Sequence, residues 1–387
     1  MKPILRFTNF DNDWEEIELL KIASEISYGM NAASKEYDGE NKYIRITDID
    51  EQTNKYTHKN IVSPDGDLEE KFLVKENDIL FARTGASTGK TYLYDKNDGK
   101  LYYAGFLIKA NIINHNANFI FQQTKLNKYN NWVKIMSMRS GQPGINSQEY
   151  GSYKFSITSP KEENKVSNFL SLLDKKIELQ SKKIEDLKLF KKGLIKDFYN
   201  EYNLRQIKIK EIGKIVTGTT PSKSINSYWD NGNITWVTPT DINDSRDIND
   251  SFFKITDKGL NKGKFIPKNA VLVTCIASIG KNAVLKVDGS CNQQINAIIP
   301  NKNFNYNYVY YLIESISNYM KSIAGTSATS IINKEEFSKI IVKVHSKEKQ
   351  DYIASVLSQF EIKILLEISK LNKFYQLKKG LMQNMFV

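Results

Sequence analysis

The chain has 387 residues with 55 Lys and Arg against 44 Asp and Glu, which gives a formal charge of +11. This length predicts two or three domains, and 40% hydrophobic with 11% aromatic content excludes a disordered chain. Two cysteines, Cys275 and Cys291, are too few for a disulfide framework or a cysteine metal site, so we expect a cytoplasmic protein. No run approaches the roughly 18 apolar residues of a membrane span. The basic charge makes nucleic acid or an acidic membrane surface a plausible partner.

In the first part of the chain, the sequence predicts mostly short strands. Residues 43–49 are a β-rich run, residues 78–83 a buried strand that ends at a glycine-containing turn, and residues 91–94 the next strand. Helical spacing follows at 118–138, and a last strand is expected at 153–158. This mixture predicts a domain with both strands and helices.

A long helix is expected next, because apolar residues return at steps that alternate between four and three. That is the spacing of a coiled-coil seam. The same seam recurs 187 residues later, with matching polar interruptions: Gln180 corresponds to Glu367, and Lys191 to Lys378. The predicted seam residues are Val166, Leu170, Leu173, Ile177, Ile184, Leu187 and Leu194, and in the second helix Ile353, Leu357, Phe360, Ile364, Leu371, Phe374 and Leu381. Two ordinary amphipathic core helices are the alternative, which a seam of roughly 33 residues disfavours.

The stretch between the two long helices repeats the first domain. Strands are expected at 234–242, 270–276 and 283–287, helical spacing follows at 306–324, and a last strand is expected at 339–344. The offset between matching segments drifts only between 187 and 193 residues. The chain is therefore predicted to be two copies of one unit.

Connectivity favours an antiparallel pair of helices. The second domain joins the end of one helix to the start of the other, and the ends of a compact domain usually lie close together. Parallel helices would require that domain to bridge about 50 Å at 1.5 Å per residue. We predict an α+β fold in which two tandem, pseudo-symmetric mixed α/β domains are separated by an antiparallel coiled coil of two long helices. The predicted boundaries are 1–160 for the first domain, 161–199 for the first helix, 200–345 for the second domain and 346–387 for the second helix.

The sequence offers no defensible catalytic centre. Residues 84–91 approximate a P-loop, but the first glycine comes one residue late. Pro64-Asp65 with Glu69 and Lys71 is spaced too tightly for a metal-dependent nuclease and is expected to form a turn. The three histidines have no partners at ligand spacing. We therefore expect no metal, no nucleotide and no catalytic residue in this chain.

A binding architecture remains. Two similar domains in a basic chain, held apart by a rigid spacer, suit a bipartite linear target. One turn of B-DNA is about 34–36 Å, which a helical spacer of this length can span. The alternative is a non-DNA scaffold whose two similar terminal domains bind protein.

Several motifs resemble the specificity subunits of type I restriction-modification systems. They are Arg6-Phe7 through Phe10 with Trp14-Glu15, Gly218-Thr219-Thr220-Pro221-Ser222 with Tyr228-Trp229 and Ile234-Thr235-Trp236, Gly141-Gln142-Pro143-Gly144-Ile145-Asn146, Asn292-Gln293-Gln294, and the Lys-Lys-Gly-Leu ends of both helices. The first domain departs from the pattern, because Tyr28-Gly29-Met30-Asn31 replaces the Gly-Thr-Pro-Ser run and the Asn-Gln-Gln triplet is missing.

The resemblance implies a non-catalytic subunit that reads two DNA half-sites, one with each target-recognition domain. It also implies that the helices carry two modification subunits, which bind S-adenosylmethionine and methylate adenine. Restriction subunits that hydrolyse ATP with Mg would join to translocate and cut DNA. No cofactor is expected in the chain itself.

Residues that could contact DNA are cationic or small polar side chains on predicted loops. In the first domain they are Arg45, Arg83, Ser87, Lys90, Lys134, Arg139 and Gln142. In the second they are Lys223, Thr238, Ser278, Lys281, Asn282, Lys321 and Thr326. Solvated surface is the alternative for each residue, and we expect Trp229 and Trp236 to pack rather than stack on bases.

The polar seam positions allow two interpretations. They fix the register of the helices at some cost in stability, or they lie at the edge of the seam with their polar ends in water. We favour the second. The exposed helix sides, rich in Lys and Glu, are the expected docking surface for partner subunits.

Overall fold

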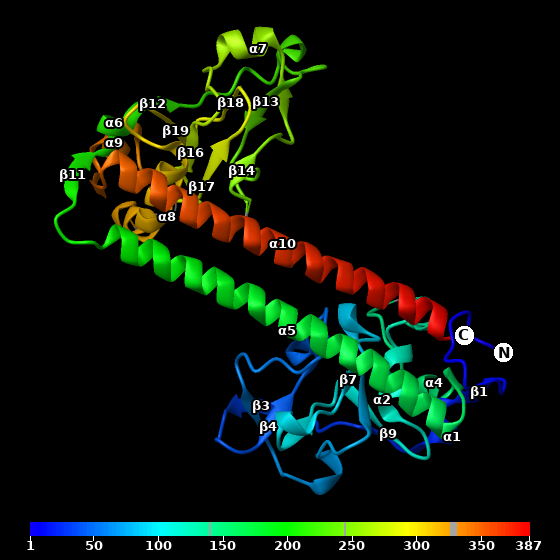
Figure 1. The fold of residues 1–387 in the computed structure, drawn as a ribbon. Coiled ribbons are helices and arrows are strands. Elements are labelled where there is room, and N and C mark those ends of the chain that lie inside the picture. Colours follow the sequence, from blue (N-terminus) through cyan, green and yellow to red (C-terminus); the bar gives the residue numbers. More distant parts are fainter. Residues whose placement is uncertain (139–140, 244, 326–330) are drawn as a thin grey trace. The chain divides into compact units, whose positions relative to one another are not determined.

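The computed structural model describes residues 1–138, 141–243, 245–325 and 331–387 (Figure 1). Its internal contacts divide the chain into two units. Unit 1 comprises residues 1–180 with 370–387, and unit 2 comprises residues 181–369. Among the described residues, no helix combines the length and the apolar character that crossing a membrane requires.

Unit 1 is built on a four-stranded antiparallel sheet with the strand order β2-β9-β6-β7. These strands are β2 Ala23–Tyr28, β9 Leu107–Ile112, β6 Asp78–Ala82 and β7 Thr91–Leu93. Three strand pairs accompany the sheet: antiparallel β1 Glu15–Glu18 with β10 Lys154–Ile157, antiparallel β3 Ala33–Glu36 with β5 Val62–Asp65, and parallel β4 Lys42–Ile44 with β8 Leu101–Tyr103. The short helices are α1 Leu19–Ile22, α2 Ala117–Gln123, α3 Asn127–Met136 and α4 Ser147–Gly151, and the 3-10 turns are Ile46–Asp48, Glu70–Phe72, Gly85–Ser87 and Lys96–Asp98.

Unit 2 repeats this plan with a five-stranded sheet of order β12-β19-β16-β17-β14. These strands are β12 Gly213–Thr217, β19 Ile295–Pro300, β16 Val271–Thr274, β17 Asn282–Leu285 and β14 Asp247–Ile248. A three-stranded sheet joins β15 Lys254–Ile255, β13 Ile234–Val237 and β18 Gly289–Cys291, and β11 Arg205–Lys208 pairs with β20 Ile341–Val344. The short helices are α6 Ile209–Ile212, α7 Asp257–Lys262, α8 Tyr306–Ile323 and α9 Lys334–Lys339, with a 3-10 turn at Asn226–Tyr228.

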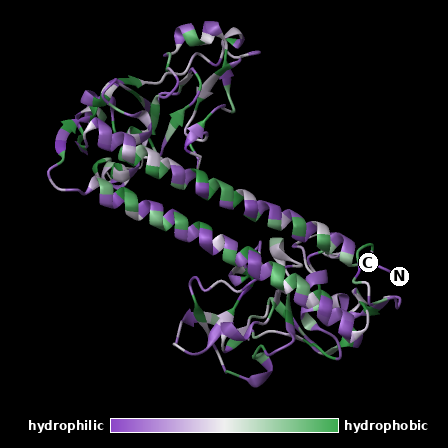
Figure 2. Cartoon of the chain, in the orientation of Figure 1, coloured by the Kyte–Doolittle hydropathy of each residue, from purple (hydrophilic) through white to green (hydrophobic). Residues whose placement is uncertain are grey.

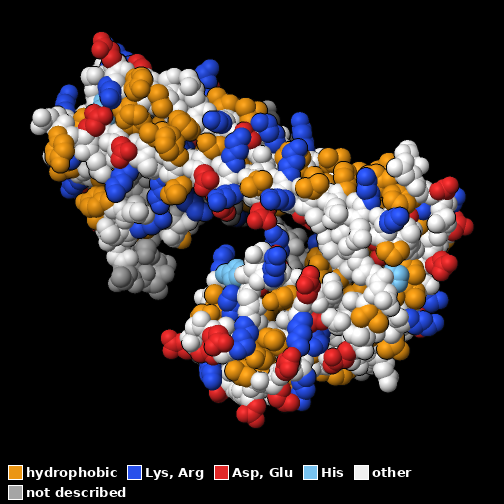
Figure 3. All heavy atoms as spheres, turned by 60° about the horizontal axis from the view of Figure 1, so that its bottom comes forward, with side chains coloured by type: hydrophobic (Ala, Val, Ile, Leu, Met, Phe, Trp, Pro, Cys, Tyr) orange, Lys and Arg blue, Asp and Glu red, His pale blue; other side chains and the backbone are white. Residues whose placement is uncertain are grey.

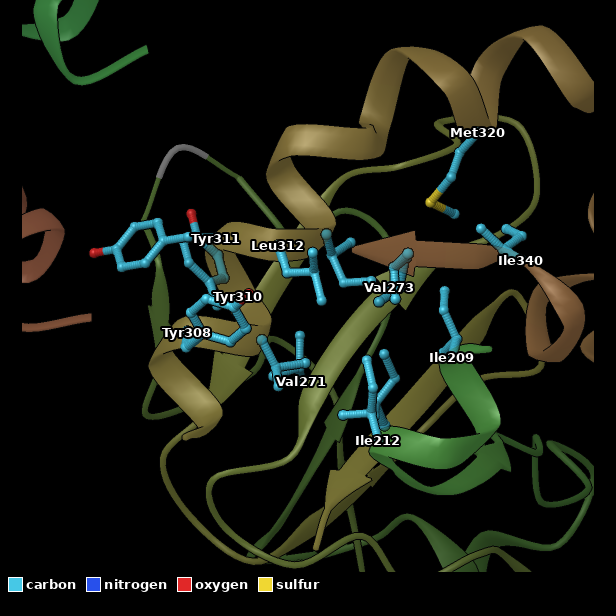
Figure 4. Packing of buried hydrophobic residues seen from close by; sticks show 14 of the residues in the cluster. Ile209, Ile212, Val271, Val273, Tyr308, Tyr310, Tyr311, Leu312, Met320 and Ile340 are labelled. Atoms are coloured by element: carbon cyan, nitrogen blue, oxygen red, sulfur yellow. The ribbon is translucent and has the colours of Figure 1, made fainter. Parts of the chain in front are cut away.

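The core of unit 2 forms where α8 covers the sheet (Figure 4). Val271 and Val273 on β16 are fully buried, as are Tyr308 and Ile313 on α8. Ile209 of α6 lies in the same cluster. In unit 1 the corresponding cluster joins β6, β9, α2 and α3 to the ends of α5 and α10. Helices thus bury one face of each sheet, and a second buried cluster covers the other face.

Two long helices, α5 Pro160–Tyr199 and α10 Lys347–Met385, contribute to both units. Proline at the first helical position is favourable, because its missing N–H would have no partner there. Figure 2 shows hydrophobic and hydrophilic residues alternating along both helices, as a seam requires.

The contacts within each unit show that the two helices are antiparallel. In unit 1 the Lys176 ammonium lies 4.8 Å from the centroid of the Phe374 ring. In unit 2 the rings of Phe190 and Phe360 are 5.3 Å apart. The residue number rises along α5 as that of its partner on α10 falls, so the predicted α+β fold with an antiparallel helix pair is confirmed.

All fourteen predicted seam residues are buried or half-buried. The expectation that the polar seam positions keep their polar ends in water is wrong for Lys191 and Glu367, whose side chains are 10% and 6% exposed. Lys191 bonds to Glu361 at 2.5 Å, and Glu367 accepts a hydrogen bond from Lys183 at 3.0 Å. A desolvated charge is retained only when it has such a partner.

Two predicted elements end earlier than expected. The strand predicted at 43–49 stops at Ile44, because the Asp48 carboxylate accepts a hydrogen bond from the Arg45 N–H at 2.9 Å and starts a 3-10 turn. The helix predicted at 118–138 is two helices, since the buried Thr124 hydroxyl donates to the Phe121 carbonyl at 2.8 Å and competes with the helical bonds.

Candidate nucleic-acid interface

The loop after β6 in unit 1 holds three of the predicted contact residues. It passes through the 3-10 turn Gly85–Ser87 and returns into β7, tied by a 2.9 Å bond from the Gly89 N–H to the Ala82 carbonyl. Gly85 and Gly89 have φ of 75° and 90°, the left-handed region that glycine adopts without strain. A strand follows this loop, whereas a P-loop leads into a helix, so the predicted absence of that motif agrees with the local fold.

A second loop, residues 141–146, lies against the first. The Gly85 N–H donates to the Pro143 carbonyl at 3.0 Å, and the Ile145 N–H donates to the Arg83 carbonyl at 2.9 Å. Asn146 then caps α4 by accepting from the Glu149 N–H at 2.9 Å. These bonds bring Arg83, Ser87 and Gln142 into one exposed region, although Gln142 is far from the others in sequence.

Arg83 is held in place by stacking. Its guanidinium lies 4.7 Å from the centroid of the Tyr28 ring, and Nη1 donates to the Gly105 carbonyl at 3.4 Å. The neighbouring Phe106 is 63% exposed. A planar guanidinium fixed on an aromatic ring loses little freedom on binding. Sequence reasoning missed Tyr28 and Phe106, because an exposed aromatic residue has no signal without its neighbours.

Two other predicted contact residues of unit 1, Arg45 and Lys90, already form hydrogen bonds within the protein. The Arg45 guanidinium bonds to both carboxylate oxygens of Asp48, at 2.8 and 2.9 Å, and this hydrogen bonding raises the pKa of Arg45. The Lys90 ammonium donates to the Ile49 carbonyl at 3.2 Å. Lys134 lies exposed on α3, and Arg139 falls outside the described residues.

In unit 2, two motifs far apart in sequence form one structure, here called the strand-end junction. The Thr219 N–H donates to the Cys291 carbonyl at 2.9 Å, and the Thr220 hydroxyl donates to Gln293. A Cβ on Gly218 would lie 2.2 Å from the Asn292 carbonyl oxygen, so only glycine permits this approach.

Unit 1 builds the same junction from different residues. A Cβ on Gly29 would lie 2.3 Å from the Ala104 carbonyl oxygen, and the Met30 N–H donates to the Tyr103 carbonyl at 2.9 Å. Gly29 and Met30 therefore make the same backbone contacts in unit 1 as Gly218 and Thr219 make in unit 2. The departure noted in the sequence changes side chains, and these backbone contacts are kept.

The predicted contact residues of unit 2 differ in availability. Lys223, Lys281 and Lys321 are exposed, and Ser278 is half-buried. The Thr238 hydroxyl donates to Asp241 at 2.7 Å. Thr326 falls outside the described residues.

Asn282 faces the core of unit 2. It is 9% exposed and donates to the Tyr310 carbonyl at 2.8 Å, so its amide is already engaged. Its burial leaves little of this side chain for a contact with DNA.

Aromatic residues surround the junction in unit 2. Trp236 is 3% exposed and lies 5.0 Å from the ring of half-buried Trp229, which agrees with the expected packing role. Phe252 is 84% exposed and sits edge-on to Phe253, over which the Lys223 ammonium lies at 5.8 Å. The sequence analysis did not single out this exposed pair.

The described residues contain no group of three or more acidic, His or Cys side chains that could hold a metal ion. Burial raises the pKa of Cys275 to about 11 and that of Cys291 to about 12, so both thiols stay neutral. Neutral, buried thiols are poor nucleophiles.

The chain is thus two tandem copies of one α+β unit, each presenting basic and polar loops. The chain belongs to the type I restriction-modification DNA specificity domain family, whose profile matches residues 12–189 and 203–374. The two matched ranges follow the duplication, so the resemblance predicted from the motifs is confirmed.

Known members of this family resemble the chain to different extents. The type I restriction enzyme MjaIX specificity subunit of Methanocaldococcus jannaschii is 35% identical over 160 residues, which cover 40% of this chain and only 37% of that protein. The HindI specificity subunit of Haemophilus influenzae is 23% identical over 427 residues, covering 87% of this chain and 91% of that one. A crystal structure of the type I restriction-modification S subunit from M. genitalium shares the fold, with a TM-score of 0.62 at 14% identity over 100% of this chain and 99% of that one.

Proposed function

We propose that this chain is the specificity subunit of a type I restriction-modification complex and reads a bipartite DNA target, one half-site with each unit. The observation that carries the proposal is the strand-end junction, which both units build with the same backbone bonds and different side chains. A common framework with different contact residues allows two half-sites of different sequence.

The contact residues divide into two groups. Arg83, Ser87 and Gln142 of unit 1 lie together at the ends of loops, where they can reach base edges in the major groove. Lys281 and Lys321 of unit 2 are exposed ammonium groups suited to backbone phosphates. Phosphate contacts set the register, and the base contacts supply sequence specificity.

Catalysis belongs to partner subunits in this proposal. Modification subunits would bind S-adenosylmethionine, and restriction subunits would use ATP and Mg. The helices offer a docking surface, because large apolar side chains are exposed along them. These are Leu172, Leu179 and Leu377 in unit 1 and Leu189, Phe190, Ile362 and Leu365 in unit 2. Figure 3 shows exposed hydrophobic side chains among Lys and Arg side chains.

Selection from a random duplex library tests DNA reading. The full chain, assembled with its modification subunits, should enrich two short conserved sequences separated by a spacer of fixed length. Enrichment of one continuous sequence, or of none, would refute the bipartite proposal. Binding to random duplex should also weaken steeply with salt, which a protein-binding scaffold would not show.

Co-purification tests docking. Leu189→Ser and Leu179→Ser remove exposed apolar side chains and should reduce recovery of the modification subunits, while thermal stability of the isolated chain stays unchanged. Glu185→Ser, at an exposed position of the same helix, is the matched control. Equal recovery of the modification subunits with all three variants would show that these apolar side chains are not the docking surface.

A further inference from the structure

Unit 1 contains a pocket of about 370 Å³ beside the loop that follows β6. Residues 86–91 form one wall, residues 51–54 another, and Thr124 with Lys125, at the end of α2, a third. Two lysines, Lys90 and Lys125, line it. Lys90 was predicted to contact DNA, whereas nothing in the sequence singled out Lys125.

Lys125 is a cation without a compensating carboxylate. Its ammonium lies 4.3 Å from the centroid of the Phe121 ring, and it forms no ion pair within the described part of the chain. Burial, together with the like charge of Lys378, lowers the pKa of Lys125 to about 7. The nearby Asp174 is already hydrogen-bonded to Lys378. Holding a half-buried charge in this way costs free energy, which a bound anion would recover.

The equivalent position in unit 2 carries the opposite charge. Asn116 and Asn305 cap α2 and α8 at matching positions, because Asn116 accepts from the Phe119 N–H at 2.9 Å and Asn305 accepts from the Tyr308 N–H at 3.3 Å. Each donor lies three residues after its cap, which fixes the register between the copies. Nine residues after each cap lie Lys125 and Glu314. Glu314 lies 3.4 Å from the ammonium of Lys191, so unit 2 neutralises its helix lysine where unit 1 adds a second positive charge.

We propose that this pocket binds a phosphate group through Lys125 and Lys90. The inference rests on the proposed function, because a phosphate of the DNA backbone is the ligand that a specificity subunit would supply. Inorganic phosphate is the other possible source of the same chemistry.

The lining favours phosphate over other anionic ligands. In the part of the chain that the structure describes, no aromatic residue lines the pocket, so no described side chain there would stack on a nucleobase. Among the described residues, Glu51 supplies the one carboxylate on its walls, and this side chain is 83% exposed and lies 3.5 Å from the Lys90 ammonium. Ammonium and hydroxyl donors around a small cavity match an anion with several acceptor oxygens.

A first experiment measures the thermal midpoint of the full chain in inorganic phosphate against sodium chloride of equal ionic strength at pH 6.5. Phosphate should raise the midpoint of the wild type and of Lys125→Arg, and should not raise that of Lys125→Gln. Lys21→Gln, an exposed lysine on α1 outside the pocket, should respond like the wild type. In chloride alone, Lys125→Gln should melt at or above the wild-type temperature, which shows that it folds.

A second experiment identifies the source of the phosphate. Affinity for a random 20-base-pair duplex is measured between 50 and 200 mM salt. If the pocket holds a backbone phosphate, Lys125→Gln should lower the slope of log K against log salt by about 0.9. Its affinity should fall roughly fivefold to tenfold, as expected for one lost phosphate contact.

The two experiments separate the outcomes. If Lys125→Gln loses the phosphate-induced rise in thermal midpoint but keeps the wild-type salt slope, the pocket binds free phosphate. If Lys125→Gln loses the rise and also has a reduced salt slope, the pocket binds a DNA phosphate. If the wild type does not bind duplex but phosphate still raises its thermal midpoint, the proposed DNA-binding function is refuted and the phosphate site in the pocket is supported. No phosphate shift in the wild type together with an unchanged slope in Lys125→Gln overturns the inference.

Discussion

Lys191 and Glu361 form a 2.5 Å ion pair between the two long helices in unit 2. The residues 187 positions away, Lys378 and Asp174, form the corresponding pair in unit 1 with the roles of the helices exchanged. In the first pair the lysine is on α5, and in the second it is on α10. The ion pair was therefore duplicated with the unit, and each copy depends on the antiparallel arrangement.

Removing Lys191 should destabilise unit 2. Lys191→Met leaves Glu361 and Glu314 as neighbouring half-buried carboxylates without a cation, and we expect a loss of roughly 3 kcal/mol in the free energy of unfolding. Chemical denaturation followed by circular dichroism measures it. Lys191→Met combined with Glu361→Leu should recover most of the loss, and the exposed control Lys192→Met should change little. A single variant as stable as the wild type would contradict the assignment.

Arg83→Ala should affect one half-site only. The substitution removes a guanidinium that is stacked on Tyr28, and we expect binding to weaken by about 1–3 kcal/mol with relaxed preference at one or two positions of a single half-site. Selection from a random library reads both effects. Arg83→Lys keeps the charge and loses the planar stacking, so it should restore affinity more than sequence preference. A uniform loss across both half-sites would exclude base reading by Arg83.

Affinity for DNA should depend on pH through Lys125. Its pKa is lowered to about 7, so the free protein loses this charge as pH rises from 6 to 8.5. The groups that face it are Lys378, Asp174 and Lys55, with Lys90 and Glu51 in the pocket. Duplex binding, measured at constant ionic strength, should therefore weaken over this range in the wild type and much less in Lys125→Gln.

The lowered pKa of Lys125 also makes the stability of the fold depend on pH. Stability should rise with pH, whereas the affinity for DNA should fall. A lysine whose folded pKa is depressed destabilises the fold fully below pH 7, and this penalty decreases as pH rises toward the ordinary value of 10.5. Relative to Lys125→Gln, the wild type should gain stability between pH 7 and 10. Denaturation at several pH values measures it, and a constant difference would show that the pKa is normal.

Glycine at the strand-end junction should be irreplaceable. Gly218→Ala and Gly29→Ala place a Cβ within 2.3 Å of a carbonyl oxygen, and we expect each to cost roughly 2–3 kcal/mol. Each variant should impair the half-site read by its own unit. Gly193→Ala is the matched control: its Cβ meets open space on a helix, so it should stabilise by about 0.5–1 kcal/mol. Thermal melting and library selection check both expectations.

The candidate site could be predicted only in part. Loop glycines and basic residues pointed to Arg83, Ser87 and Gln142, which the fold does bring together. The same reasoning chose Asn282, whose amide faces the core, because composition alone does not distinguish a surface polar residue from a buried one. It passed over Phe106, since an exposed aromatic residue looks like a core residue until its surroundings are known.

The sequence by itself determined the duplication, the seam and the direction of the helices. The duplication can be recognised from the repeated order of residues, and the seam from the spacing of apolar residues. The direction of the helices follows from the way the second domain connects the two helix ends. Only the tertiary structure decided which side chains meet. Gly218 approaches Asn292 because strand pairing joins segments that are far apart in the chain. The pKa of Lys125 is lowered because the folded chain removes water from its ammonium group and places Lys378 nearby. Contacts between distant segments and the desolvation of charges depend on folded coordinates, which no local pattern encodes.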